Sequence, residues 1–156
     1  MKKILIALDY DPSAEQIAKA GHDLATATGA QTVLVHIIAD ALYYSSLDYS
    51  PVMGYTGFSS PDMVPLVDIQ ALRDASLNFL EQTKRHLNDE SIQVMVGDGD
   101  CAEALLETAT EIGADVIVIG SHSRRGLDKI LMGSISEKVL NHTTIPLFMI
   151  PTKKGA

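Results

Sequence analysis

The sequence predicts an α/β fold in which helices cover both faces of one open, mostly parallel, five-stranded sheet. Five short apolar runs, most of them rich in Val and Ile, are unbroken rather than alternating, as in strands buried on both faces. Segments with helical spacing separate these runs, and strands that alternate with helices form crossover units. The chain has 156 residues, 46% hydrophobic and 21% charged, which suits one globular domain with a sizeable core. We therefore expect a single domain over residues 1–156.

The five expected strands cover residues 3–8, 32–38, 92–96, 115–120 and 145–150. The first expected helix has Asp11 as its N-cap, Pro12 at its first helical position and Gly29 near its end. Its apolar stripe repeats at spacings of three and four residues, through Ile17, Ala20, Leu24 and Ala27.

Two further helices are expected in the middle of the chain. The second covers about residues 66–87 and turns Leu72, Leu77 and Leu80 toward the core. The third lies between a start that resembles a capping box, Asp100-Cys101-Ala102-Glu103, and a stop at Gly113.

The start of the fourth expected helix, at Gly133, is also a candidate anion site. Ser134 and Glu137 form an S-x-x-E capping box, and Val139 and Leu140 supply the buried side of the helix. A helix N-terminus presents unpaired backbone N–H groups and the positive end of the helix dipole, so it can hold a phosphate. On these residues alone, a capped helix start without a ligand is an equally weighted alternative.

Residues 41–65 break the alternation of strands and helices. Proline, glycine and serine are dense there, and every tyrosine of the chain except Tyr10 lies in this stretch. This composition predicts an irregular excursion of about 25 residues. Two interpretations stay open: a segment that folds over a ligand or partner, and a surface loop without a function of its own.

Charge and cysteine content exclude several classes of protein. Lys plus Arg number 12 and Asp plus Glu number 20, so the formal charge is −8, a poor match to nucleic acid or anionic lipid. The single cysteine, Cys101, excludes an intramolecular disulfide and a zinc-finger cluster. The five apolar residues after Met1-Lys2-Lys3 are too few for a signal peptide, and no run approaches the ~18 apolar residues of a membrane span. We expect a cytoplasmic protein.

Two strand ends carry unusual residues. The first strand runs into Asp9, and the fourth runs into a stretch from Gly120 to Ser134 that contains three glycines. In open parallel sheets, ligands bind beyond the carboxyl ends of the strands, where the strand order reverses. Residues 120–138 hold four cations and two anions, a local charge of +2 that suits an anionic ligand. The loop is neither a Walker A loop nor a G-x-G-x-x-G motif.

Segments spread over nearly the whole chain fit one family pattern. They are the opening strand with Asp9, the stretch Leu34-Val35-His36-Ile37, the pair Gly97-Asp98, and residues 113–120 and 137–147. Together with the spacing Gly120-x2-Ser123-x9-Gly133-Ser134, these segments resemble the universal stress protein family. The nucleotide-binding branch of that family carries G-x2-G-x9-G-[ST]. The spacing is kept here, and Ser123 replaces one of the three glycines.

The resemblance implies a Rossmann-like sheet of order 3-2-1-4-5 with ATP, with or without Mg²⁺, or ADP or AMP, bound between strands one and four. The resemblance also implies which residues contact each part of the nucleotide. Asp9 would lie on the adenine or ribose side, and the adenine would be lined by Ala7, Leu8 and Ile37. The ribose would lie beside Ile119 and Gly120, and the phosphates would be held by Ser123, Gly133, Ser134 and Ile135. Independently of the family, a carboxylate at a strand end can accept hydrogen bonds from ribose hydroxyls or an exocyclic amine. Capping of the following turn is the alternative role for Asp9.

Ser123 leaves two functions open. If its backbone tolerates an L-residue, its hydroxyl adds a phosphate donor, and the protein is a dimeric regulator or switch that binds an adenine nucleotide. If a positive φ is required there, serine costs about 1 kcal/mol, and the protein acts through protein–protein contacts without a nucleotide. A third hypothesis is that the protein is a slow ATPase or phosphotransferase. It depends on His122 and the nearby carboxylates Asp9, Asp11 and Asp128. Nothing in their spacing commits these carboxylates to Mg²⁺, so efficient turnover is not expected and no metal site is assigned.

Three further residues or segments have expected roles. The apolar strand 145–150 suits a sheet edge, and the resemblance implies a homodimer in which two such strands pair. An edge blunted by Pro146 and Pro151 is the alternative. His36 is expected to be a core histidine with its hydrogen bonds satisfied, and Cys101 a partly buried, inert thiol.

Overall fold

The computed structural model describes residues 1–10, 12–39, 69–121 and 134–152 of the chain. Its elements, in chain order, are β1 (Lys3–Ala7), α1 (Ala14–Thr28), β2 (Gln31–Ala39), α3 (Ile69–His86), β3 (Gln93–Gly99), α4 (Cys101–Ile112), β4 (Val116–Gly120), α5 (Ser134–His142) and β5 (Leu147–Ile150). The five strands form one sheet of order β3-β2-β1-β4-β5, and every neighbouring pair is parallel. The predicted fold class and strand order are therefore confirmed.

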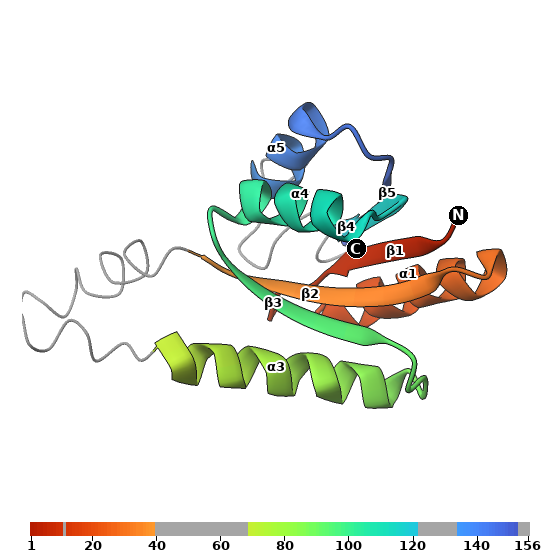
Figure 1. The fold of residues 1–156 in the computed structure, drawn as a ribbon, viewed down its shortest axis with the longest axis horizontal. Coiled ribbons are helices and arrows are strands. Elements are labelled where there is room, and N and C mark those ends of the chain that lie inside the picture. The colour runs from red at the N-terminus through yellow and green to blue at the C-terminus, as the bar shows by residue number, and fades with distance from the viewer. Residues whose placement is uncertain (11, 40–68, 122–133, 153–156) are drawn as a thin grey trace, which may run out of the picture.

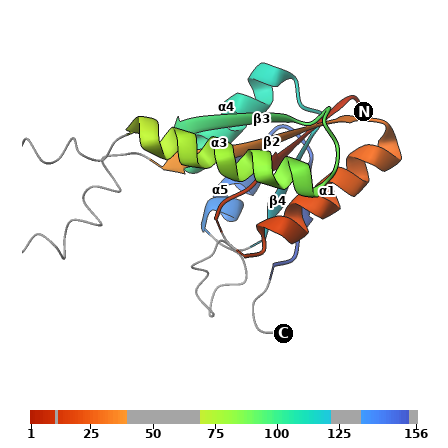
Figure 2. The same ribbon diagram turned by 90° about the horizontal axis from the view of Figure 1, so that it is seen from below.

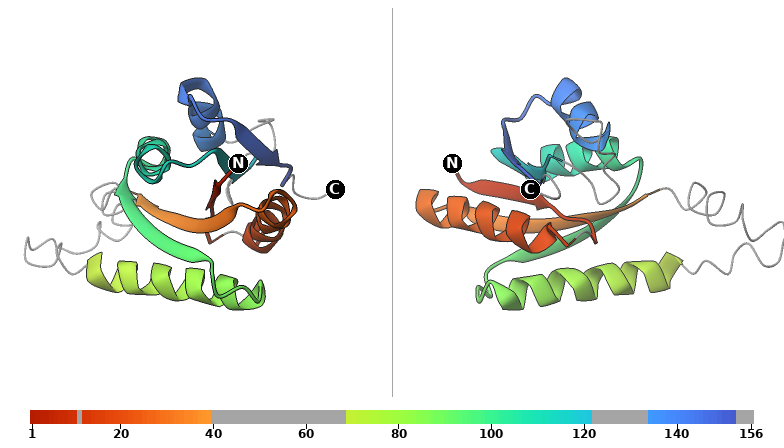
Figure 3. Two further views of the ribbon diagram at one scale, coloured as in Figure 1. Left: turned by 45° about the vertical axis from the view of Figure 1, so that its right-hand side comes forward. Right: turned by 180° about the vertical axis from the view of Figure 1, so that it is seen from behind.

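Helices cover both faces of this sheet. Helices α1 and α3 lie on one face, and α4 and α5 lie on the other (Figures 1 and 2). Alternate residues of one strand serve the two layers: Ile4 and Ile6 pack toward α1 and α3, and Leu5 packs toward α4 and α5. Burial on both faces explains why the strands read as unbroken apolar runs. The two further views show the twist of the sheet between its helical layers (Figure 3).

The packing of α1 on the sheet depends on the absence of a side chain at Gly21. A Cβ atom at this position would lie 2.6 Å from Cδ1 of Ile6 and 3.2 Å from Cγ1 of Val118. The helix therefore lies directly over β1 and β4, the two strands whose carboxyl ends form the candidate site.

The beginning of α1 differs from the prediction. Its N-cap is Ser13 rather than Asp11, because the first helical hydrogen bond runs from the Ile17 N–H to the Ser13 carbonyl at 3.0 Å. Asp11 itself lies outside the described residues. The predicted end is confirmed, because Gly29 adopts the left-handed conformation with φ of 70°.

Two leucines assigned to buried helix faces are exposed. Leu77 of α3 is 39% exposed, because the face of α3 that meets the sheet runs through Ser76 and Leu80, and residue 77 lies on the next face around the helix. Leu140 of α5 is 48% exposed, and the adjacent Val139 is fully buried as expected.

The limits of α4 are confirmed. The Asp100 carboxylate accepts a hydrogen bond of 3.0 Å from the Glu103 N–H, and Gly113 ends the helix with φ of 69°. The expected irregular stretch at 41–65 lies outside the described residues.

Candidate functional site

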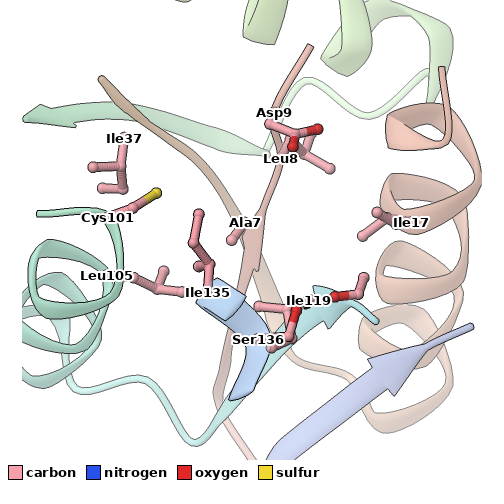
Figure 4. Close-up of a pocket in the computed structure, with 11 residues that line it drawn as sticks. Ala7, Leu8, Asp9, Ile17, Ile37, Cys101, Leu105, Ile119, Ile135 and Ser136 are labelled. Carbon is pink, nitrogen blue, oxygen red and sulfur yellow. Dashed lines mark hydrogen bonds between the residues drawn. The ribbon is translucent and has the colours of Figure 1, made fainter. Parts of the chain in front are cut away.

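A cleft opens at the carboxyl ends of β1 and β4, between helices of the two layers. It is open to solvent, and its empty volume, including the solvent at its mouth, is about 610 Å³. Seven of the ten residues predicted for the nucleotide site line it: Ala7, Leu8, Asp9, Ile37, Ile119, Gly120 and Ile135. Figure 4 labels all of these residues except Gly120 around one space, with Ala7 and Asp9 following the course of β1.

Four further lining residues were not predicted. They are Ile17 of α1, Cys101 and Leu105 of α4, and Ser136 of α5. All four lie on helices, and the sequence pattern shows which helix face is apolar but not which residue reaches the end of a strand. The repeat through Ile17 and the capped start beside Cys101 were the available signals.

The three remaining predicted residues belong to the loop between β4 and α5 and its end. Ser123 and Gly133 lie outside the described residues. Ser134 is the first residue of α5, directly before Ile135 in the wall of the cleft. The helix therefore begins at the cleft, and the positive end of its dipole lies there.

The cleft is apolar apart from a few polar groups at its rim. Asp9 supplies a carboxylate two residues beyond the end of β1, and Cys101 supplies a half-buried thiol across from it (Figure 4). Burial, and then the nearby carboxylates of Asp9 and Asp100, raise the pKa of the Cys101 thiol to about 11. The thiol is therefore neutral near pH 7, and among the described lining residues Asp9 supplies a carboxylate that can accept hydrogen bonds.

Aromatic side chains of β2 and α3 contact the residues that follow β1. His36 is buried in β2, and its Nδ1–H donates to the Leu8 carbonyl at 2.8 Å. The Tyr10 ring packs against His36 and Phe79 with centroid distances of 4.7 and 4.9 Å, and its hydroxyl lies 3.1 Å from Oγ of Ser76. The prediction of a satisfied core histidine is confirmed.

Two polar contacts place α5 beside the cleft. The hydroxyl of Ser136 donates to the carbonyl of Gly120 at 2.7 Å, and Nζ of Lys138 lies 3.1 Å from the Asp100 carboxylate. These contacts join α5 to the end of β4 and to the first turn of α4.

No group of three His, Cys, Asp or Glu side chains in the described ranges is arranged to hold a metal ion. Likewise, in the part of the chain that the structure describes, no helix has both the length and the apolar character needed to cross a bilayer.

Known proteins resemble this chain along its whole length. A family model described as the universal stress protein family matches residues 1–151. Universal stress protein MJ0577 of Methanocaldococcus jannaschii is 26% identical over 99% of this chain and 97% of its own length. The solved structure of MJ0577 superimposes with a TM-score of 0.73, at 24% identity over 99% of this chain and 98% of that one. A universal stress protein crystallised in complex with cAMP superimposes with a TM-score of 0.62, at 18% identity over 97% of each chain. With the family match covering nearly every residue, the chain belongs to the universal stress protein family.

Proposed function

We propose that this universal stress protein binds an adenine nucleotide, with ATP as the leading candidate, in the cleft at the ends of β1 and β4. The observation that carries the proposal is the composition of that cleft. Among its described lining residues, it combines apolar side chains, one carboxylate and the N-terminus of a helix. These three features suit the three parts of a nucleotide: a flat base, a ribose and a chain of phosphates.

The base and the ribose would occupy the interior. Ala7, Ile37 and Leu105 offer apolar contacts to a planar ring. The Asp9 carboxylate can accept hydrogen bonds from the adenine amine or from ribose hydroxyls. Cys101 lines the same cleft as a neutral thiol, so it adds no second negative charge there.

The phosphates would extend toward the start of α5. Backbone N–H groups at a helix N-terminus and the helix dipole attract an anion. Ser123, Gly133 and Ser134 belong to this end of the site by their positions in the family motif, and Mg²⁺ would accompany the phosphates of ATP. The crystallised relative of the same fold holds cAMP, which is itself an adenine nucleotide.

Isothermal titration with ATP, ADP, AMP and cAMP tests the proposal, with GTP as the comparison for the base. The variant Ile135→Asp places a carboxylate in the wall of the cleft beside the start of α5, and we expect its ATP affinity to fall at least about tenfold. Leu140→Asp is the matched control, because Leu140 is exposed on the same helix and does not line the cleft. It should bind ATP like the wild-type protein.

Thermal unfolding gives an independent readout. A ligand at ~100 times its dissociation constant stabilises a protein by about 2.7 kcal/mol, or roughly 5–10 °C for a domain of this size. We expect this shift for the wild-type protein and none for Gly133→Val. If millimolar ATP neither shifts the transition nor releases heat, the protein acts without a nucleotide, through protein–protein contacts.

The regulatory part of the proposal concerns a homodimer in the cytoplasm. Strand β5 ends the described sheet, and Phe148 on it is 38% exposed. Pairing of two such strands would extend the sheet and cover this side chain. Light scattering at micromolar concentration should give the mass of a dimer for the wild-type protein and of a monomer for Phe148→Asp. A monomeric wild-type protein would refute the dimer and leave the nucleotide site untouched.

A further inference from the structure

We propose that Ser136 is a positioning residue for the phosphate end of the site. Its hydrogen bond to the Gly120 carbonyl fixes the first turn of α5 against the end of β4, and that turn then sets the affinity for phosphates. This inference rests on the proposed nucleotide site and assigns to Ser136 a role that the family motif, which ends at Ser134, does not include.

The hydrogen bond is short and partly buried. Ser136 is 6% exposed, and its hydroxyl donates to the Gly120 carbonyl at 2.7 Å, across 16 positions of sequence. A serine hydroxyl has one proton to donate, and here the Gly120 carbonyl accepts it. Ser136 therefore acts through the placement of the helix rather than as a donor to the ligand, although it lines the cleft (Figure 4).

Gly120 is held in place by the sheet, so a hydrogen bond to it can position a helix. It is the last residue of β4 and pairs with Ile150 of β5, and the next residue, Ser121, donates its N–H to the Ile150 carbonyl at 2.8 Å. A hydrogen bond to this carbonyl therefore links α5 directly to the sheet.

Ser136 lies in the first turn of α5, at the N-terminal end of the helix, which is the end that attracts an anion. It lies two residues after Ser134, where the helix begins, and one residue after Ile135 in the wall of the cleft. Farther along the helix, the buried Val139 packs into the core and holds the middle of α5. Without the Ser136 bond, the middle would stay packed and the first turn would lose its link to β4. Binding groups must be held within about 0.5 Å of their working positions, so the loss of this link would lower the affinity for the phosphates.

Titrations with adenosine and with ATP separate the two ends of the site. We expect Ser136→Ala to lower the ATP affinity about tenfold, a loss within the range that a ~1 Å misplacement produces, and to leave the adenosine affinity within about twofold. Ser136→Thr keeps the hydroxyl and should restore the wild-type ratio of the two affinities. Ser136→Cys keeps the size of the side chain with a weaker donor, and should lower the ratio even if the alanine variant does not fold.

Thr32→Ala is the matched control, because Thr32 is a buried hydroxyl residue with a 3.2 Å contact to Nδ1 of His22, near the amino end of β2 and away from the cleft. It should lower the melting temperature and leave the ratio of ATP to adenosine affinity unchanged. The positioning role is refuted if Ser136→Ala or Ser136→Cys folds and keeps the wild-type ratio. A wild-type protein that binds neither ligand refutes the proposed function itself, and the positioning role with it.

Discussion

The Nδ1–H of His36 donates a 2.8 Å hydrogen bond to the carbonyl of Leu8, the residue that joins the end of β1 to Asp9. A carbonyl oxygen can only accept, so the contact fixes the proton on Nδ1. The bond crosses from β2 to the segment beyond the last residue of β1 and holds that segment in place. The carboxylate at the rim of the candidate site thus follows directly after a residue anchored from the core.

Loss of this anchor should destabilise the fold. His36→Phe keeps an aromatic ring beside Tyr10 and removes the donor, which leaves a buried carbonyl without that partner. We expect the free energy of unfolding to fall by about 1–3 kcal/mol in urea denaturation. His142→Phe makes the same change at an exposed histidine and should alter stability by less than about 0.5 kcal/mol. Equal effects of the two changes would show that the His36 contact adds nothing.

A side chain at Gly120 should clash with α1. A Cβ atom there would lie 2.6 Å from Cδ1 of Ile17 and 3.1 Å from Cγ2 of Thr152. We expect Gly120→Ala to cost about 1–3 kcal/mol of stability in urea denaturation, the usual penalty for overpacking. Ile17→Val removes the methyl group that the new Cβ would meet, so the double variant should be more stable than the sum of the single effects predicts. Strict additivity would contradict the close approach of α1 to the end of β4.

The sheet could be predicted from sequence because its strands are buried on both faces, and burial leaves unbroken apolar runs. The last residues of β3 show the limit of this signal. The apolar run ends at Val96, but the strand continues to Gly99, because Gly97 and Gly99 pair with Ile37 and Ala39 of β2. Pairing of this kind is set by the neighbouring strand and leaves no trace in local composition.

The helix faces were harder to predict because one of them includes a buried polar residue. Ser76 lies on the inner face of α3, where its hydroxyl meets that of Tyr10, 66 residues earlier in the chain. No local pattern reveals that partner, so the sequence favours the apolar Leu77 over Ser76 as the buried residue. At the candidate site, the residues carried over on strands line the cleft, whereas Cys101, Leu105 and Ser136 could be found only after the helices were packed.

Cys101 should react slowly with alkylating reagents. With a thiol pKa of about 11, about one molecule in a thousand carries the reactive thiolate at pH 8. We expect the alkylation rate to rise up to about pH 11, and to increase sharply once urea unfolds the chain. A nucleotide in the cleft should slow the reaction further, because Cys101 lines it. Rapid alkylation of the folded protein at pH 8 would contradict the buried, neutral thiol.

The same thiol makes stability depend on alkaline pH. An unfolded thiol ionises near its ordinary pKa of 9.0, whereas the folded one keeps its proton to about 11. Between these two values the folded state therefore binds more protons than the unfolded state. The contribution of the Cys101 thiol to stability is complete below pH 9.0 and declines as the pH rises toward 11. Urea denaturation should show a smaller alkaline loss for Cys101→Ala than for the wild-type protein. Parallel pH profiles would contradict the raised pKa.

Asp100 should stabilise the start of α4 mainly as an N-cap and less as a partner of Lys138. The Glu103 N–H, and then the hydrogen bond from Lys138, lower the pKa of its carboxyl below the ordinary value. This contribution is complete above the ordinary pKa and is lost as the pH falls through the lowered one. Asp100→Ala should cost about 1 kcal/mol at pH 7, whereas Asp100→Asn keeps the capping oxygen and should lose less than half of that. Urea denaturation at pH 7 and at pH 3 measures both effects, and the wild-type protein should lose more stability on acidification than Asp100→Asn. If the Asn and Ala variants were equally destabilised at pH 7, the ion pair with Lys138, rather than the cap, would be the main contribution of Asp100.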